Sequence, residues 1–282
     1  MCVDLHLHST ASDGRLSPKQ LVVEAVKRGL KVIAVTDHDS TDGVDEALEA
    51  SKRFPSLRVV PGVEINTDIP HGEVHILGLF INYKSEKLQN ILSRLRNSRV
   101  LRAKNMIAKL ASLGIHIDMG RVLQIASGGS IGRPHIAQAM YEAGYTSSIQ
   151  EAFIRYIGRD GPAYVERERL TPAEAVKLVT DVDGLPVLAH PADIDNVEDL
   201  ILSLKEAGLA GIEVYYNNYS RETRTWLGSL ADKYELIPTG GSDFHGFGDE
   251  VETKIGASGV PCESARRLTT LAESKAKERM PK

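Results

Sequence analysis

Histidines and carboxylates recur together in this chain, each time beside a short apolar run. Six of the nine histidines lie in such segments: His6, His8, His38, His75, His190 and His245. Carboxylates accompany them at Asp13, Asp37, Glu64 and Asp243. Imidazole and carboxylate are the ligands that borderline divalent metals prefer in proteins. The grouping predicts a site that holds more than one metal ion, and metal-assisted hydrolysis as its chemistry.

The spacing of the first pair supports a shared metal ion. His6 and His8 are two positions apart in an apolar run, so a strand would direct both imidazoles to one face. Asp13 follows in a loop, and Glu64 ends another apolar run, where a carboxylate can bridge two ions. Any one of these histidines, taken alone, is more often a hydrogen-bonded structural residue. The whole set, at one kind of location, favours a metal centre.

The elements that must position these residues alternate along the chain. Apolar, β-branched runs predict seven strands: Cys2–His8, Val32–Thr36, Arg58–Ile65, Val74–Ile81, Leu185–Ala189, Gly211–Tyr216 and Leu236–Gly240. Segments of helical period lie between most of them, at 17–29, 42–54, 171–184, 196–208 and 220–234. Strands joined by helices imply parallel pairing with right-handed crossovers. We therefore expect an α/β fold, a (β/α)7 barrel related to the eight-stranded form, with its chemistry at the carboxyl ends of the strands.

One long segment interrupts this alternation. Residues 85–165 contain no convincing strand and read as helices, which predicts a helical lid between the fourth and fifth strands. The barrel would then comprise residues 1–84 and 166–282. The first helix of the lid has a basic polar face, interpreted in the first instance as a solvated surface: Arg94, Arg96, Arg99, Arg102, Lys104 and Lys109.

The bulk properties restrict the partners and the compartment. A formal net charge of −4 gives no general basic field for long nucleic acid. Cys2 and Cys262 lie too far apart in sequence to suggest a disulfide framework, so a reducing compartment is expected. No apolar run has membrane-spanning length, and the first residues enter a strand too early for a signal peptide. We expect a cytoplasmic protein with no membrane association and no implied protein partner.

Six motifs in order along the chain resemble those of the PHP family, named for its polymerase and histidinol-phosphatase members. They are DLHLHSTASDG, AVTDHDS, PGVEI, HILGL, AHP and GGSDFHG. The resemblance implies a distorted, TIM-like seven-stranded barrel with a trinuclear metal centre. It assigns one ion to His6, His8, Glu64 and Asp243, a second to Glu64, His75 and His190, and a third to Asp13, His38 and His245. Asp37 and Asp39 are then expected to orient imidazoles. Three divalent ions are implied, with Mn²⁺ expected and Zn²⁺, Fe²⁺ or Mg²⁺ as alternatives.

A GRPH sequence within the lid adds two candidate substrate residues. Arg133 suits bidentate phosphate recognition and Pro134 would fix a helix start, although a plain helix cap explains the same pattern. A PHP subgroup with this lid and motif removes the 3′-phosphate of nucleoside 3′,5′-bisphosphates or trims RNA from its 5′ end. That resemblance implies that Arg133 and His135 hold a phosphate and that His135 protonates the leaving oxygen. Asn217 and Asn218, after the sixth strand, are further substrate-binding candidates, although loop asparagines commonly form turns.

Phosphoester hydrolysis is the expected reaction. Clustered cations lower the pKa of bound water, hold anionic oxygens and neutralise the leaving group, so hydroxide can attack phosphorus in line. The expected catalytic set is Asp13, His38, His245, Arg133 and His135. The favoured substrate is a small nucleotide, above all the 3′-phosphate of a nucleoside 3′,5′-bisphosphate. The alternatives are a 5′-3′ exoribonuclease acting on short RNA and a histidinol-phosphate-type phosphatase. Less favoured are a metal-stabilised module without activity and a deaminase or amide hydrolase.

Overall fold

The strands of this protein form one sheet in the computed structural model. The structure describes residues 2–69, 72–126, 129–166, 168–216, 219–246 and 254–279. Its seven strands follow one another in chain order. They are β1 (Val3–Asp4), β2 (Val32–Val35), β3 (Arg58–Ile69), β4 (Gly72–Leu79), β5 (Leu185–Leu188), β6 (Gly211–Tyr216) and β7 (Ile237–Gly241). All seven predicted strands are present, within a few residues of the expected ends.

The sheet closes towards a barrel because the chain after β1 lies beside β7. The Leu5 amide donates to the carbonyl oxygen of Gly240 at 3.2 Å, and the Asp243 amide donates to that of His6 at 3.0 Å. Gly241 permits this approach, since a Cβ there would lie 2.3 Å from the Cβ of His6. The expected α/β barrel is thereby confirmed.

The direction of β4 corrects the expectation of parallel pairing throughout. β1, β2 and β3 are parallel, as are β5, β6 and β7, but β4 is antiparallel to both β3 and β5. β3 ends at Ile69 and β4 begins at Gly72, which leaves no room for the crossover helix that a parallel pair requires. The amino-terminal end of β4 therefore lies at the same barrel edge as the carboxyl ends of the other strands.

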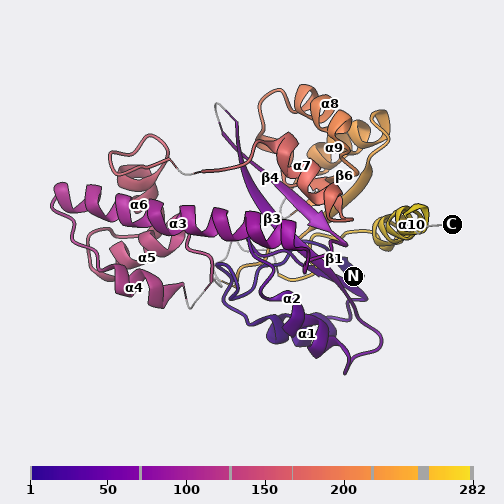
Figure 1. Cartoon of the computed structure of the whole chain (residues 1–282), viewed down its shortest axis with the longest axis horizontal. Helices are drawn as coiled ribbons and strands as arrows, with labels where there is room; N and C mark the ends of the chain where they lie inside the picture. The colour runs from indigo at the N-terminus through magenta and orange to yellow at the C-terminus, as the bar shows by residue number, and fades with distance from the viewer. Residues whose placement is uncertain are drawn as a thin grey trace.

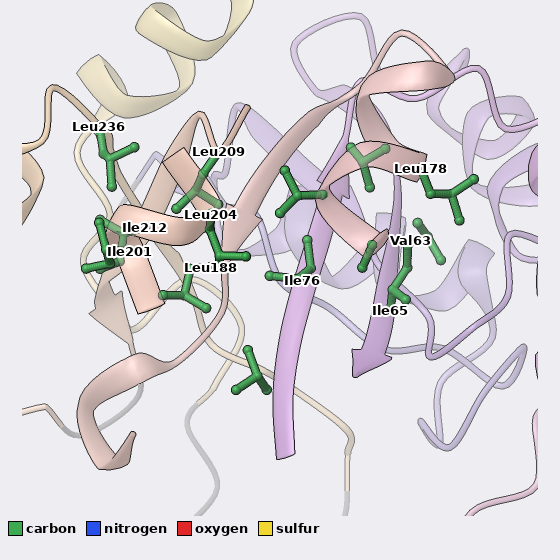
Figure 2. Close-up of a cluster of buried hydrophobic side chains, with 14 of the residues drawn as sticks. Val63, Ile65, Ile76, Leu178, Leu188, Ile201, Leu204, Leu209, Ile212 and Leu236 are labelled. Atoms are coloured by element: carbon green, nitrogen blue, oxygen red, sulfur yellow. The ribbon is translucent and has the colours of Figure 1, made fainter. Parts of the chain in front are cut away.

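The helices around the barrel match the predicted segments. They are α1 (Pro18–Lys27), α2 (Val44–Ser51), α7 (Pro172–Asp181), α8 (Val197–Ala207) and α9 (Arg221–Lys233). Two further elements, α10 (Cys262–Glu278) and a short 3₁₀ turn η2 (Pro191–Asp193), lie outside those segments. Ser17 and Thr171 begin α1 and α7 with capping boxes followed by proline. These helices bury their apolar faces against the sheet in hydrophobic clusters. Figure 2 shows one such cluster, which includes Val63, Ile65, Ile76, Leu178, Leu188, Ile201, Leu204 and Ile212.

The lid projects to one side of the barrel, with its long first helix running across the molecule (Figure 1). It comprises α3 (Glu86–Ser112), α4 (Met119–Ile125), α5 (Arg133–Glu142), α6 (Ile149–Ala152) and a π-helical turn η1 (Phe153–Ile157). The first half of α3 packs Leu88 and Leu92 into a barrel cluster, and its second half packs Met106 and Leu110 into a separate lid cluster. One continuous helix thus joins the two cores. The division of the chain at residues 84 and 165 stays a prediction.

The two cysteines are bonded to each other. Cys2 precedes β1 and Cys262 begins α10, and their Cα atoms lie 5.6 Å apart in a disulfide. The expectation that cysteines so far apart in sequence indicate no disulfide is wrong, because β1 and α10 pack in the same hydrophobic cluster. Within the described ranges, no helix is both long and apolar enough to cross a bilayer.

Candidate metal centre

His6 and His8 face a pair of carboxylates inside the barrel mouth. The two Nε2 atoms lie 3.3 and 3.2 Å from Oε2 of Glu64, and 3.2 and 3.0 Å from Oδ1 of Asp243. Ligand atoms of these four residues all lie within 4.8 Å of one another. The structure therefore brings together the first ligand set that the sequence suggested.

The other oxygen of Glu64 faces a second pair of histidines. Oε1 lies 2.7 Å from Nδ1 of His75 and 3.3 Å from Nε2 of His190, and these two nitrogens are 3.2 Å apart. Because the two carboxylate oxygens face different imidazoles, Glu64 is placed to bridge two cations. His75 reaches this position from the amino-terminal end of β4, which only the reversed direction of that strand allows.

Asp13 lies among three further imidazoles. Its carboxylate oxygens are 3.9 Å from Nε2 of His38, 3.5 Å from Nε2 of His245 and 3.9 Å from Nδ1 of His8. His38 also places Nδ1 2.8 Å from Oε2 of Glu64. The groups therefore overlap more than the sequence suggested, since His8 and His38 each lie between two of them.

Three residues at or beside the candidate metal centre have an unusual backbone conformation. Asp39, His190 and Asp243 adopt positive φ values, in the left-handed region that residues other than glycine rarely occupy. Such strain is concentrated at functional sites, where surrounding contacts maintain it. His190 follows β5 closely and Asp243 follows β7, so the turn after each strand directs the side chain into the barrel mouth.

The pKa shifts of these histidines and carboxylates show why they suit a cation. Burial lowers the pKa of His8, but the adjacent carboxylates of Asp243 and Glu64 raise it to about 10. Burial raises the pKa of Glu64, but the charges of His38, His6 and His75 hold it well below its usual range. Several buried ligand atoms make no hydrogen bond within the described part of the chain, among them Nε2 of His6, both ring nitrogens of His8, Oδ1 of Asp13 and Oε2 of Glu64. These donors fit divalent cations, which would replace the protons and satisfy the unpaired atoms.

Glu213 supports the site and was missed by the sequence reasoning. It lies fully buried on β6, with both carboxylate oxygens 3.2 Å from Nδ1 of His6, and it accepts a hydrogen bond from the His190 amide at 2.9 Å. A carboxylate that holds the far nitrogen of a metal-binding imidazole fixes its tautomer and its orientation. The one available signal was a lone acidic residue inside the apolar run GIEVYY.

Asp37 and Asp39 stabilise the surrounding structure. Asp37 accepts hydrogen bonds from the amide and hydroxyl of Ser9 and from the hydroxyl of Ser12, so it fixes the loop after His8. The expectation that it orients an imidazole is wrong. Asp39 pairs with Arg99 of α3, at 2.6 Å. Arg99 also donates to Asn66, whose amide nitrogen lies 2.7 Å from Nε2 of His75, so the lid contacts a candidate ligand through this chain.

The GRPH residues begin α5 as expected. Arg133 donates to Oε1 of Glu73 at 2.9 Å, and Nδ1 of His135 accepts from the Gly132 amide at 2.9 Å. His135 is buried, and this burial lowers its pKa. The neutral ring therefore carries its proton on Nε2. Asn217 and Asn218 lie outside the described residues.

The family comparison agrees with this geometry. The model of the PHP domain family matches residues 4–166. The chain is 32% identical over 247 residues to a 5′-3′ exoribonuclease Rnm of Salmonella typhimurium, covering 86% of this chain and 84% of the relative. It is 32% identical over 252 residues to a 3′,5′-nucleoside bisphosphate phosphatase of Chromobacterium violaceum, covering 88% of each. It is also 32% identical over 251 residues to a phosphoribosyl 1,2-cyclic phosphate 1,2-diphosphodiesterase of Eggerthella lenta, covering 87% of this chain and 95% of the relative.

The fold has a close match among solved structures. A Bifidobacterium adolescentis protein, a candidate metal-dependent phosphoesterase, superposes with a TM-score of 0.87 at 30% identity and covers 96% of both chains. The lid and the barrel are therefore both included in the likeness.

Proposed function

Since this chain belongs to the PHP family and is a metal-dependent phosphoesterase, we propose that it removes the 3′-phosphate of nucleoside 3′,5′-bisphosphates. The observation that best supports a hydrolytic metal centre is the position of Glu64, whose two oxygens face separate groups of imidazoles at the barrel mouth. A nucleotide substrate is supported by the relatives, because two of the three activities named above act on nucleoside bisphosphates or RNA.

Three divalent cations are proposed at the mouth, with Mn²⁺ as the expected metal. His6, His8, Glu64 and Asp243 would hold one, Glu64, His75 and His190 a second, and Asp13, His38 and His245 the third. Bound cations of this kind lower the pKa of water and neutralise phosphoryl oxygens. Glu213 and Asn66 would keep the imidazoles of His6 and His75 in place as these cations bind.

Residues of the lid act on the substrate in this proposal. Arg133 binds a phosphate through its guanidinium group, and His135 gives its Nε2 proton to the leaving oxygen after Nδ1 has taken up a second proton, so that the ring returns to its neutral form. In the resting protein Nδ1 accepts from the Gly132 amide, so this contact must open when the ring is protonated. Asn217 and Asn218 stay predicted substrate residues.

A second candidate function is 5′-3′ exoribonuclease activity on short RNA. It is favoured by the relative of that name and by the basic residues of α3. Both activities would use one metal centre on substrates of different length. A cytoplasmic location also stays a proposal. Its support is now the proposed nucleotide or RNA substrate, because the paired cysteines no longer argue for a reducing compartment.

Phosphate release separates the candidates. The purified, Mn²⁺-loaded protein is incubated with adenosine 3′,5′-bisphosphate and with a 5′-phosphorylated oligoribonucleotide, and the products are resolved by chromatography. The proposal expects adenosine 5′-monophosphate and inorganic phosphate from the bisphosphate. An intact bisphosphate beside a shortened oligonucleotide would overturn it in favour of the exoribonuclease.

A further inference from the structure

Tyr216 ends β6 at the barrel mouth and contacts a candidate metal ligand. Its hydroxyl donates to Oδ2 of Asp243 at 2.8 Å. The other oxygen of the same carboxylate, Oδ1, lies 3.2 and 3.0 Å from Nε2 of His6 and of His8. The two oxygens of Asp243 therefore have separate partners, since a phenol holds one and the other faces the imidazoles.

A shift of register in β6 directs Tyr216 to this position. Side chains alternate along a regular strand, so residues 213 and 216 would point to opposite faces of the sheet. Glu213 pairs with Thr239 of β7. Three residues later Tyr216 pairs with Gly241, which is only two residues further along β7, so β6 contains a bulge. Gly240 permits the bulge, because a Cβ there would collide with the backbone of β6. Bulges beside active sites commonly redirect one side chain, as this one does.

Neighbouring rings hold the phenol in place. The centre of the Tyr216 ring lies 5.3 Å from that of His190 and 6.4 Å from that of His6. It also lies 5.0 Å from the ring centre of Tyr219, whose hydroxyl accepts a hydrogen bond from the Ala192 amide at 3.1 Å. Aromatic rings at such separations favour defined mutual orientations. The position of the Tyr216 hydroxyl is thus fixed by its surroundings.

The carboxylate of Asp243 depends on such a contact for its orientation. Its backbone lies in the left-handed region, and its amide donates to the carbonyl oxygen of His6. Its side chain is 20% exposed, and the terminal torsion of aspartate varies broadly, so the backbone does not decide which oxygen faces the imidazoles. The hydrogen bond from Tyr216 to Oδ2 leaves Oδ1 for that role.

We propose that Tyr216 is a positioning residue, which holds Asp243 so that Oδ1 is presented to the cation at His6, His8 and Glu64. This inference rests on the proposed function and deepens it, because it identifies a residue that prepares one of the metal ligands. Without the hydroxyl, the cation itself would have to order the carboxylate, and that loss of preorganisation weakens binding. Tyr216 acts through Asp243 in this role.

The test compares Mn²⁺ binding by the wild-type protein, Tyr216→Phe and Tyr83→Phe. Each protein is first stripped with EDTA, and its affinity is then measured by competition with a chromophoric chelator. Tyr83 is the matched control, because its hydroxyl donates to the carboxylate of Asp45 at 2.7 Å, outside the candidate ligands. Tyr216→Phe should bind as many ions as the wild-type protein at saturation, with about 10- to 100-fold lower affinity at one site. Tyr83→Phe should bind Mn²⁺ as the wild-type protein does.

A second comparison separates positioning from a structural role. In the Asp243→Ala background, Tyr216→Phe should cause no further loss of Mn²⁺ affinity, because the residue through which Tyr216 acts is absent. A further loss there would overturn the proposal, as would unchanged affinity in Tyr216→Phe alone. One ion fewer at saturation would also overturn it, since Tyr216 would then be a ligand itself. Thermal melting checks each fold, and Tyr216→Leu, which also lacks the hydroxyl, replaces Tyr216→Phe if the latter does not fold.

These affinities do not depend on the substrate. A wild-type protein that binds Mn²⁺ but leaves adenosine 3′,5′-bisphosphate intact would contradict the proposed function, and the affinities would still decide the role of Tyr216. A wild-type protein that cleaves the bisphosphate and binds Mn²⁺ no more tightly than Tyr216→Phe would refute the positioning role alone. A wild-type protein that binds no Mn²⁺ would contradict both.

Discussion

The carboxylate of Glu213 lies 3.2 Å from Nδ1 of His6, although 207 positions separate the two residues in the chain. The opposite nitrogen of the same ring, Nε2, faces Glu64 and Asp243. Glu213 thus occupies the side of His6 that a metal ion would leave free, and it holds the backbone of His190 as well. One buried carboxylate thereby fixes two candidate ligands that come from different strands.

Replacing Glu213 by glutamine should weaken metal binding while the fold persists. The amide keeps the shape of the side chain but removes the charge that polarises His6, and losses of such partners lower metal affinity about 10- to 100-fold. Competition with a chromophoric chelator measures the affinity. Glu206→Gln, on the exposed face of α8, is the matched control. Unchanged affinity in Glu213→Gln would mean that Glu213 has a structural role alone.

Asp13→Ala should remove one cation and most of the activity. Asp13 lies in a loop outside the strands and faces His8, His38 and His245, so the barrel core does not depend on it. Elemental analysis should show one metal ion fewer per chain than in the wild-type protein, with an unchanged far-ultraviolet circular dichroism spectrum. Asp42→Ala, at an exposed position nearby, should alter neither. A full metal complement in Asp13→Ala would refute the assignment.

Arg99→Met should destabilise the protein by about 3–5 kcal/mol, because it removes the guanidinium that pairs with the buried carboxylate of Asp39. The double variant with Asp39→Asn should recover part of this loss, since the buried negative charge is removed. Urea unfolding of both variants gives the two free energies. Lys104→Met controls for the loss of a charge from α3. A double variant that is less stable than Arg99→Met would contradict this account of the pair.

The metal-free protein should lose stability as the pH rises from 7 to 10. The pKa of His8 is raised from 6.5 to about 10, so its protonated form stabilises the fold fully below pH 6.5, and this contribution disappears as the pH passes 10. The pKa values of Glu64 and Asp243 are lowered, so their contributions are lost only in acid. Melting temperatures of chelator-treated protein test this from pH 6 to 10. Parallel profiles for the wild-type protein and His8→Gln would show that His8 does not cause the loss.

Much of the barrel could be predicted from the sequence because its elements are locally marked. β6 was predicted with its observed ends, since an apolar run between a glycine and polar residues reads as a buried strand. Ser17 and Thr171 mark the starts of their helices in the same way. The direction of β4 was misjudged because the length of a connection, rather than the composition of a strand, determines parallel or antiparallel pairing.

The parts that could not be predicted depend on contacts between distant segments. Periodicity shows that α3 has a basic face, but it cannot show that Arg99 and Arg102 are buried against the barrel and the lid. Glu213 resembles any isolated acidic residue until β6 is placed beside His6. Cys2 and Cys262 become neighbours only when α10 packs against the start of the barrel. The candidate metal ligands could be selected from the sequence because their residue types carry the chemistry wherever the chain places them.

Metal removal tests the central claim most directly. The purified protein is analysed for bound metals, treated with EDTA, and assayed for phosphate release from adenosine 3′,5′-bisphosphate before treatment, after it, and after Mn²⁺ is restored. A metal-dependent centre built from these imidazoles and carboxylates predicts stoichiometric metal, loss of turnover in the chelator and recovery with Mn²⁺. Full turnover by protein that contains no divalent metal would contradict the account.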